Sequence, residues 1–278
     1  MEWWLAPFEL GFQQRALIGG MLAALMASTV GTWLVLRGMS FFGDAFVHGV
    51  IPGVAAAVVL DINPLLGATV AAAIMVFAIE LVQRKTVLGE DTSIGLLFVG
   101  MLALGVVIIS RLDSYSGSLT SILFGDALGV TWDDIAGQLV VLAIVVIVSA
   151  VLYRPLIALS LSRDKAELLG MRPGLAHAAL LVLIALAVIG SYQSVGTLLV
   201  FGLLVGPPAT ASLLSRTISR MMLIAALIGV VSVWLGLTIS YYWGTAASAT
   251  MALVPIVLFF AVLSVKNVVE SARARVSV

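Results

Sequence analysis

The chain has 278 residues, of which 62% are hydrophobic and only 10% are charged. Soluble domains average about 45–50% apolar and about 25% charged residues, so the composition excludes a soluble globular protein and predicts an integral membrane protein. The formal net charge of zero gives no basic bias toward nucleic acid, and the absence of cysteine excludes disulfides and thiolate metal sites.

Nine apolar runs are long enough, or nearly so, to cross roughly 30 Å of hydrocarbon as helices, which takes about 20 residues. They lie at 14–36, 40–60, 64–82, 92–110, 137–153, 175–190, 195–214, 220–241 and 246–265. The runs are continuous rather than alternating, which argues against barrel strands. Because Gly49, Pro52 and Gly53 interrupt the second run, we expect an all-α polytopic membrane protein with eight to nine transmembrane helices, forming one domain over residues 1–278.

Positive charges predict the orientation of these spans. With nine spans and the amino terminus outside, all Lys and Arg residues except Arg15 and Arg111 fall on one side. Cytoplasmic loops carry an excess of Lys and Arg, so this side is expected to be cytoplasmic. The sequence therefore predicts a multi-pass protein of the cell membrane whose carboxyl terminus is cytoplasmic.

The second run contains a carboxylate and an imidazole four residues apart, Asp44 and His48. Ionisable residues inside a span are costly and usually mark a transport path or a relay, and residues at i and i+4 share one helix face. A carboxylate oxygen and a ring nitrogen can therefore converge there on a small cation. Pro52 would free the carbonyl of His48 from its helical hydrogen bond, and Gly53 would permit close backbone approach.

Two connections differ from short loops. Residues 111–134, on the outer side, are too polar to span and too apolar to be a free loop, which favours a re-entrant or interfacial gate segment. Residues 162–174, on the inner side, combine charges with a Gly170 stop and a following Pro173, which predicts a short cytoplasmic helix. Its size suits docking in a groove on a partner protein.

These motifs resemble those of one family, the permease subunits of manganese-, zinc- and iron-type ABC importers. The family pattern Arg-x-Met-Ser-x-x-Gly-Asp-x-x-x-His-x-x-x-Pro-Gly is matched by residues 37–53. Residues 90–98, 164–170 and 195–211 match further family segments in the expected order. At position 244, where many members have an aspartate, this chain has glycine.

The resemblance implies a type II ABC importer fold and a homodimer that moves a divalent transition metal ion, Mn, Zn or Fe, along its interface. Asp44 and His48 would be the metal ligands, and Pro52 and Gly53 would break the helix beside the path. A separate cytoplasmic ATPase would bind and hydrolyse ATP, and an extracytoplasmic binding protein would deliver the metal. The residues implied to couple the permease to the ATPase are Arg163, Asp164, Glu167, Leu168, Leu169 and Gly170.

Other interpretations remain open at the sequence level. Asp44 and His48 could simply tie two helices together, and His177 is best interpreted as an interfacial residue. The glycine at position 244 favours, as alternatives, an importer of a metal chelate or of another small cation. A proton-coupled secondary carrier is a further possibility, and it would need no ATPase. The chain has no phosphate-binding Gly-x-x-x-x-Gly-Lys loop, so we expect a transport subunit without enzymatic activity and without a permanently bound cofactor.

Overall fold

The computed structural model describes residues 4, 6–86, 89–110, 128–161, 167, 168 and 170–276, and within these ranges the regular structure is entirely helical. A 3₁₀ turn, η1 (Ala6–Glu9), precedes the first long helix. The α-helices are α1 (Gly11–Leu36), α2 (Ser40–Gly49), α3 (Ile51–Val59), α4 (Pro64–Lys85), α5 (Glu90–Ile109), α7 (Trp132–Val151), α8 (Tyr153–Leu161), α10 (Pro173–Leu214), α11 (Ile218–Trp243) and α12 (Ala247–Val276).

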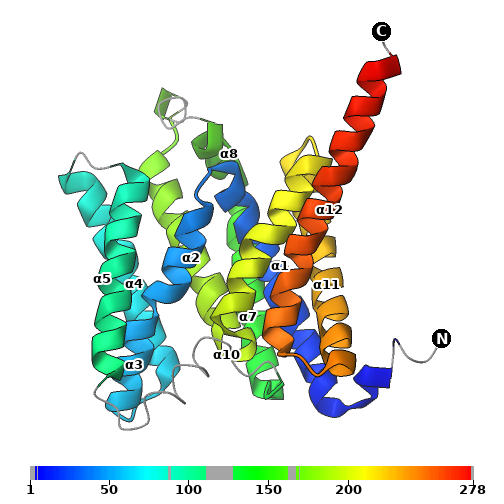
Figure 1. The fold of residues 1–278 in the computed structure, drawn as a ribbon. Helices are drawn as coiled ribbons and strands as arrows, with labels where there is room; N and C mark the ends of the chain where they lie inside the picture. The colour runs from blue at the N-terminus through cyan, green and yellow to red at the C-terminus, as the bar shows by residue number, and fades with distance from the viewer. Residues whose placement is uncertain are drawn as a thin grey trace.

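Eight segments among the described residues are long and apolar enough to cross a membrane, and the shorter apolar helix Leu198–Leu214 adds a ninth passage. The chain runs up and down the bundle, with the amino terminus at one end and the carboxyl terminus at the other (Figure 1). This architecture confirms the prediction of an all-α polytopic membrane protein with eight to nine spans.

Helix α10 makes two of these passages because it folds back on itself. At 42 residues it would be about 63 Å long if straight, roughly twice the thickness of the hydrocarbon core. Gly196 breaks it with φ 74° and ψ 168°, a backbone conformation that is essentially restricted to glycine. The two runs that the sequence shows at 175–190 and 195–214 are therefore the two arms of one broken helix, and both outer ends of α10 lie at the same end of the bundle (Figure 1).

Helix α1 lies at the centre of the bundle and packs against α10, α11 and α7. Its large side chains Met26, Trp33 and Leu34 are completely buried. Close approach to α10 requires glycine at position 31, because a Cβ atom there would overlap the backbone carbonyl of Leu204. Small residues at such crossings let two membrane helices pack backbone against backbone.

The predicted interruption of the second span occurs at Val50, between α2 and α3. Pro52 lies in the first turn of α3, where its missing N–H removes no necessary hydrogen bond. At the next residue, a Cβ atom on Gly53 would overlap the carbonyl of Gly67 on α4, and a Cβ atom on Gly67 would overlap the carbonyl of Gly53. Pro52 and Gly53 thus set the break and the tight α3–α4 crossing that holds α2 in place.

Three boundaries differ from the sequence-based expectation. Helix α7 begins at Trp132, where Thr131 and Asp134 form a reciprocal capping box, so the last residues of the expected gate segment belong to a span. Residues 111–127, which contain the rest of that segment, lie outside the described residues. Helix α8 was not expected, and its Tyr153 packs edge-on against Trp33 with ring centroids 5.6 Å apart. Helix α12 continues to Val276, and its final turns project beyond the bundle (Figure 1).

Candidate metal site on helix α2

Helix α2 has one face in the core and one face that the rest of the chain leaves uncovered. Phe42 and Phe46 are fully buried, with ring centroids 5.6 Å apart. On the other face, Phe41 is exposed, and the side chains of Asp44 and His48 are each 26% exposed. These three residues follow the i, i+3, i+7 spacing of a single helical stripe.

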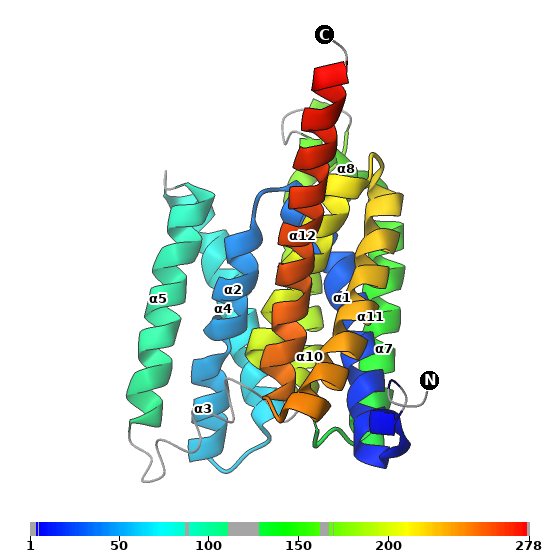
Figure 2. The same ribbon diagram turned by 45° about the vertical axis from the view of Figure 1, so that its right-hand side comes forward.

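The two predicted ligands meet on this stripe. His48 Nε2 lies 3.3 Å from Asp44 Oδ1. Helix α2 lies between α5 on one side and α10 and α12 on the other, and it packs against α5 and α10 (Figure 2). The structure therefore brings a carboxylate and an imidazole together inside a membrane span, as the i, i+4 spacing predicted.

The imidazole of His48 is held on one side by an aromatic ring from α5. The Phe98 ring centroid lies 6.1 Å from that of His48 and 5.7 Å from that of Phe41. His48 Nδ1 is buried and has no hydrogen-bond partner among the described residues. The His48 imidazole therefore directs Nε2 toward Asp44, and no hydrogen bond at Nδ1 from a described residue fixes its orientation.

The spacing of the pair suits two ligands of one metal ion. Ligand atoms bound about 2.0–2.1 Å from a tetrahedral ion lie roughly 3.3–3.4 Å apart, close to the observed Asp44–His48 separation. Carboxylate oxygen with imidazole nitrogen is a donor set for manganese, zinc or iron rather than for soft Cu(I). Among the described residues, no cluster of three or more His, Cys, Asp or Glu side chains occurs. One chain therefore offers two side-chain ligands at this place, fewer than the four that a tetrahedral ion takes.

The backbone near the pair differs from expectation in one detail. The sequence predicted that Pro52 leaves the His48 carbonyl without its helical hydrogen bond. In the structure the backbone N–H of Val50 donates to that carbonyl. Pro52 itself is buried, and Ile51 and Pro52 pack closely against Gly105 of α5. The role of Pro52 and Gly53 in this structure is to break and pack the helix, next to the pair rather than within it.

Part of the predicted coupling segment is described. Glu167 and Leu168 are helical and exposed, Leu168 to 87%. Gly170 ends this turn with φ 72°, and its N–H donates to the Glu167 carbonyl at 2.9 Å. Arg163, Asp164 and Leu169 lie outside the described residues. The described part shows an apolar side chain presented to the surroundings next to the start of α10.

The turn containing position 244 has a structural reason for glycine. Gly244 caps α11 in the left-handed conformation, with φ 63°, and the Ser240 hydroxyl donates to the Thr245 carbonyl at 2.6 Å. An L-residue at this position would be strained. The glycine is therefore explained by a helix-end turn.

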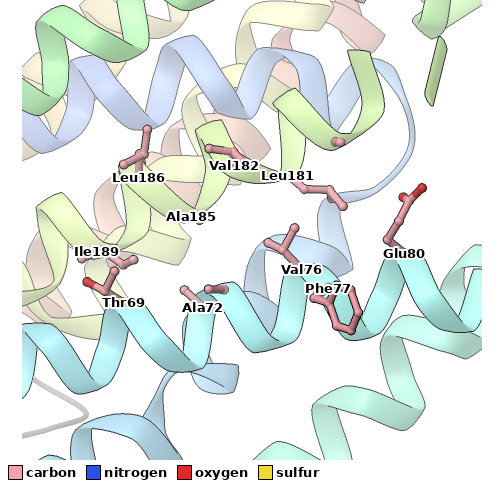
Figure 3. A pocket seen from close by; sticks show the side chains of 12 residues that line it. Thr69, Ala72, Val76, Phe77, Glu80, Leu181, Val182, Ala185, Leu186 and Ile189 are labelled. Atoms are coloured by element: carbon pink, nitrogen blue, oxygen red, sulfur yellow. The ribbon is translucent and has the colours of Figure 1, made fainter. Parts of the chain in front are cut away.

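A separate groove of about 410 Å³ lies between α4 and the first arm of α10 (Figure 3). Its walls are almost entirely apolar, with Phe77 and Val182 among them, and Glu80 is the charged residue at its edge. Neither Asp44 nor His48 lines it. Its chemistry suits hydrocarbon chains and not a small cation, so the pair on α2 remains the candidate ion site.

Two contacts in this region have no counterpart in any local sequence pattern. Phe98 follows no motif spacing relative to His48, so only the folded chain reveals their contact. His177 was interpreted as an interfacial residue, but it is only 4% exposed, and its Nδ1 lies 2.7 Å from the Arg37 guanidinium. The two residues are 140 positions apart, so no local pattern could have paired them.

Comparison with known proteins identifies a shared family. A model of the ABC 3 transport family matches residues 9–266. The chain is 34% identical over 252 residues to the manganese transport system membrane protein MntC of Listeria innocua, covering 91% of this chain and 90% of that protein. It is 37% identical over 251 residues to the manganese import system permease protein ScaB of Streptococcus parasanguinis, covering 90% and 89%.

A solved structure shares the architecture over nearly its full length. The structure of PsaBC from Streptococcus pneumoniae superimposes with a TM-score of 0.82 at 31% identity, covering 94% of each chain. The helical architecture is therefore shared with that chain over nearly the whole length of both.

Proposed function

Because the chain belongs to the ABC 3 transport family, we propose that it is the permease subunit of an importer that moves a divalent transition metal ion across the cell membrane. The observation that carries this proposal is the Asp44–His48 pair, which lies on an uncovered face of a membrane-spanning helix at 3.3 Å. Relatives named as manganese transport or import permeases support manganese as the first candidate, with zinc and iron as alternatives of the same ligand class.

A second copy of the chain would complete the site. In a two-fold symmetric dimer the same patch faces itself, so two uncovered α2 stripes would together supply two carboxylates and two imidazoles. Four ligands satisfy a tetrahedral ion, whereas one chain provides two. The incomplete cover of the pair supports this arrangement, because a carboxylate facing lipid is costly and one facing a partner or a polar path is not.

The proposed path requires weak binding. An ion must be held well enough to enter and loosely enough to leave, so conduction favours a transient site. His48 Nδ1 has no hydrogen bond among the described residues, and metal-binding histidines usually gain affinity when the second ring nitrogen donates to a partner. The lack of this support is consistent with modest affinity.

Energy would come from a separate cytoplasmic ATPase. An exposed Leu168 beside an exposed Glu167 suits helix-in-groove docking, in which an apolar anchor has a polar surround. Arg163, Asp164, Leu169 and Gly170 are proposed to complete this contact.

The basic residues at the ends of α1, α4 and α10 belong to the end of the bundle where α12 also finishes (Figure 1), which supports a cytoplasmic carboxyl terminus. An extracytoplasmic binding protein would dock at the opposite end.

Reconstitution tests the proposal directly. The permease, its ATPase and the binding protein would be placed in vesicles, and uptake of Mn²⁺, Zn²⁺ and Fe²⁺ would be followed with ATP available to the ATPase. We expect uptake that needs ATP and is unaffected by an imposed proton gradient. Uptake driven by the gradient without ATP would establish a secondary carrier instead, and transport only of a chelated metal would establish a chelate importer.

A further inference from the structure

The proposed cytoplasmic end of the bundle contains a partly buried contact that does not belong to the proposed metal site. The Arg37 guanidinium lies 2.7 Å from His177 Nδ1. Arg37 is in the turn between α1 and α2, and His177 is in the first two turns of α10, where it is 4% exposed. This contact joins two elements that are distant in sequence.

The chemistry of the contact fixes the state of the histidine. A guanidinium carries only donors and does not lose its proton in proteins. His177 Nδ1 must therefore accept, which places the ring proton on Nε2 and makes the imidazole neutral. A charge-assisted hydrogen bond of this length is among the stronger side-chain contacts, so the turn and the start of α10 are held to each other.

The Arg37–His177 contact lies between the proposed ATPase-docking segment and the helix that carries the proposed metal ligands. Helix α10 begins three residues after Gly170, where the proposed docking segment ends. On the other side, only Gly38 and Met39 separate Arg37 from α2, which carries Asp44 and His48. Gly38 adopts φ 68°, so the turn is sharp, and the Met39 N–H is bonded to the Leu34 carbonyl at 3.0 Å. If the start of α10 is displaced, the hydrogen bond from Arg37 to His177 can therefore transmit the displacement to α2 through the turn that ends at Met39.

The second arm of α10 has a different kind of contact with the same helices. Leu204 lies where Cβ atoms on Gly31 of α1 and Gly43 of α2 would be, so the contact there is close apolar packing. Such packing resists separation but has no directional bond. The Arg37–His177 hydrogen bond, in contrast, is a directional contact between α10 and the α1–α2 turn.

We propose that Arg37 and His177 are positioning residues that transmit movement of the docking segment to α2, so that ATP hydrolysis and release of metal at the Asp44–His48 pair stay coupled. This inference rests on the proposed function. It assigns no metal contact to either residue. If the first turn of α10 moves with the ATPase, the bond moves the α1–α2 turn with it.

Three variants test this link in the reconstituted complex with Mn²⁺. In His177→Leu the acceptor is removed, whereas in His177→Asn the amide oxygen takes the place of Nδ1 and can still accept from Arg37. Gln138→Leu is the matched control, since Gln138 is also a buried polar residue, at 2% exposure, but lies at the opposite end of the bundle on α7. The measured quantity is Mn²⁺ transported per ATP hydrolysed.

We expect His177→Leu to keep the ATPase bound and hydrolysing while Mn²⁺ per ATP falls about tenfold, as the loss of a typical coupling free energy would give. His177→Asn and Gln138→Leu should both stay near the wild-type ratio. An unchanged ratio in His177→Leu overturns the proposal, as does an equal fall in Gln138→Leu, which would reveal a general effect of lost packing. If the wild-type complex moves no metal at all, the proposed function fails instead, so the two failures are distinguishable.

A distance measurement keeps the proposal testable if His177→Leu does not fold. The chain has no cysteine, so one cysteine at the partly exposed Ser40, which begins α2, and one at the exposed Leu175 of α10 can be spin-labelled without background. In the wild-type chain we expect the distance between the labels to be the same with and without bound ATP, because the two elements move together. A shift of the distance on ATP binding would show that they move independently and would overturn the link.

Discussion

Two histidines in this protein each have one charged neighbour, and the two pairs are built differently. His48 and Asp44 are 3.3 Å apart on an uncovered face of α2, and both side chains are 26% exposed. His177 Nδ1 and the Arg37 guanidinium are 2.7 Å apart in a partly buried contact, with His177 at 4% exposure. A pair that must bind and release an ion needs access and a loose geometry, whereas a pair that holds two elements together needs burial and a short bond.

The largest effect is expected when one member of the Asp44–His48 pair is removed. Asp44→Ala and His48→Ala should each reduce metal uptake to background while membrane assembly and ATPase binding stay normal, because we propose that the pair is a ligand set and not a structural tie. Uptake by the purified, reconstituted complex is the measurement. Asp61→Asn is the control, since Asp61 is an exposed acid in the turn after α3, and its φ of 54° suits asparagine. Normal uptake in both alanine variants would contradict the ligand assignment.

A second variant tests the proposed contact with the ATPase while leaving the proposed metal site intact. Replacing Leu168 and Leu169 together by Asp should release the ATPase during co-purification, because the apolar anchors of the docking contact become charged. Leu60→Asp is matched to Leu168→Asp, since Leu60 is an exposed leucine, at 67%, in the turn after α3 at the other end of the bundle. Co-purification at the wild-type level in the double variant would show that residues 167–170 are an ordinary loop.

A smaller effect is expected at the ring that borders His48. Phe98→Ala removes an aromatic contact worth about 0.5–1.5 kcal/mol, which corresponds to a change of a few-fold in the apparent Mn²⁺ affinity measured by uptake. Phe77→Ala is the control, because Phe77 is an exposed phenylalanine on α4 that lines the apolar groove between α4 and α10 (Figure 3). Equal effects of the two substitutions would mean that Phe98 does not position the imidazole.

The last prediction concerns thermal stability, which His177 should affect more than His48, whereas His48 should affect metal uptake more than His177. His177→Ala removes the Nδ1 acceptor of the partly buried Arg37 guanidinium, which costs about 1–3 kcal/mol. For a chain of this size that corresponds to a melting temperature lower by roughly 2–4 °C per kcal/mol. His48→Ala removes a half-exposed side chain and should change the melting temperature of the detergent-solubilised protein much less. Equal shifts would remove the distinction between the two histidines.

The sequence predicted the spans and the exposed pair because both depend on local patterns. Apolar length alone locates a helix in a bilayer, and the i, i+4 spacing alone brings Asp44 to His48. The break near Pro52 also followed from one residue, since proline cannot donate the helical hydrogen bond. In each case the relevant information lies within a few residues of the feature.

The remaining features depend on contacts between distant segments. Helix α8 is held by the packing of Tyr153 on Trp33, 120 positions away in the printed sequence, so its existence could not be inferred from its own residues. The same holds for Phe98 beside His48 and for Arg37 beside His177. The two arms of α10 and a reversal between them were predicted, but its form, a break at Gly196 inside one continuous helix, was not, because a single glycine among apolar residues does not signal such a break.

The reversal at Gly196 has a consequence for how the protein is made. Between Arg172 and Arg216 the chain contains no Asp, Glu, Lys or Arg, so the insertion machinery meets one apolar stretch with basic residues at both ends. Basic residues stay on the cytoplasmic side, and the stretch is too long for one crossing, so its two arms must enter the bilayer together as a hairpin. The residues between the arms, Ser191, Gln193 and Ser194 among them, are polar but uncharged, so no charged side chain has to be carried across the bilayer.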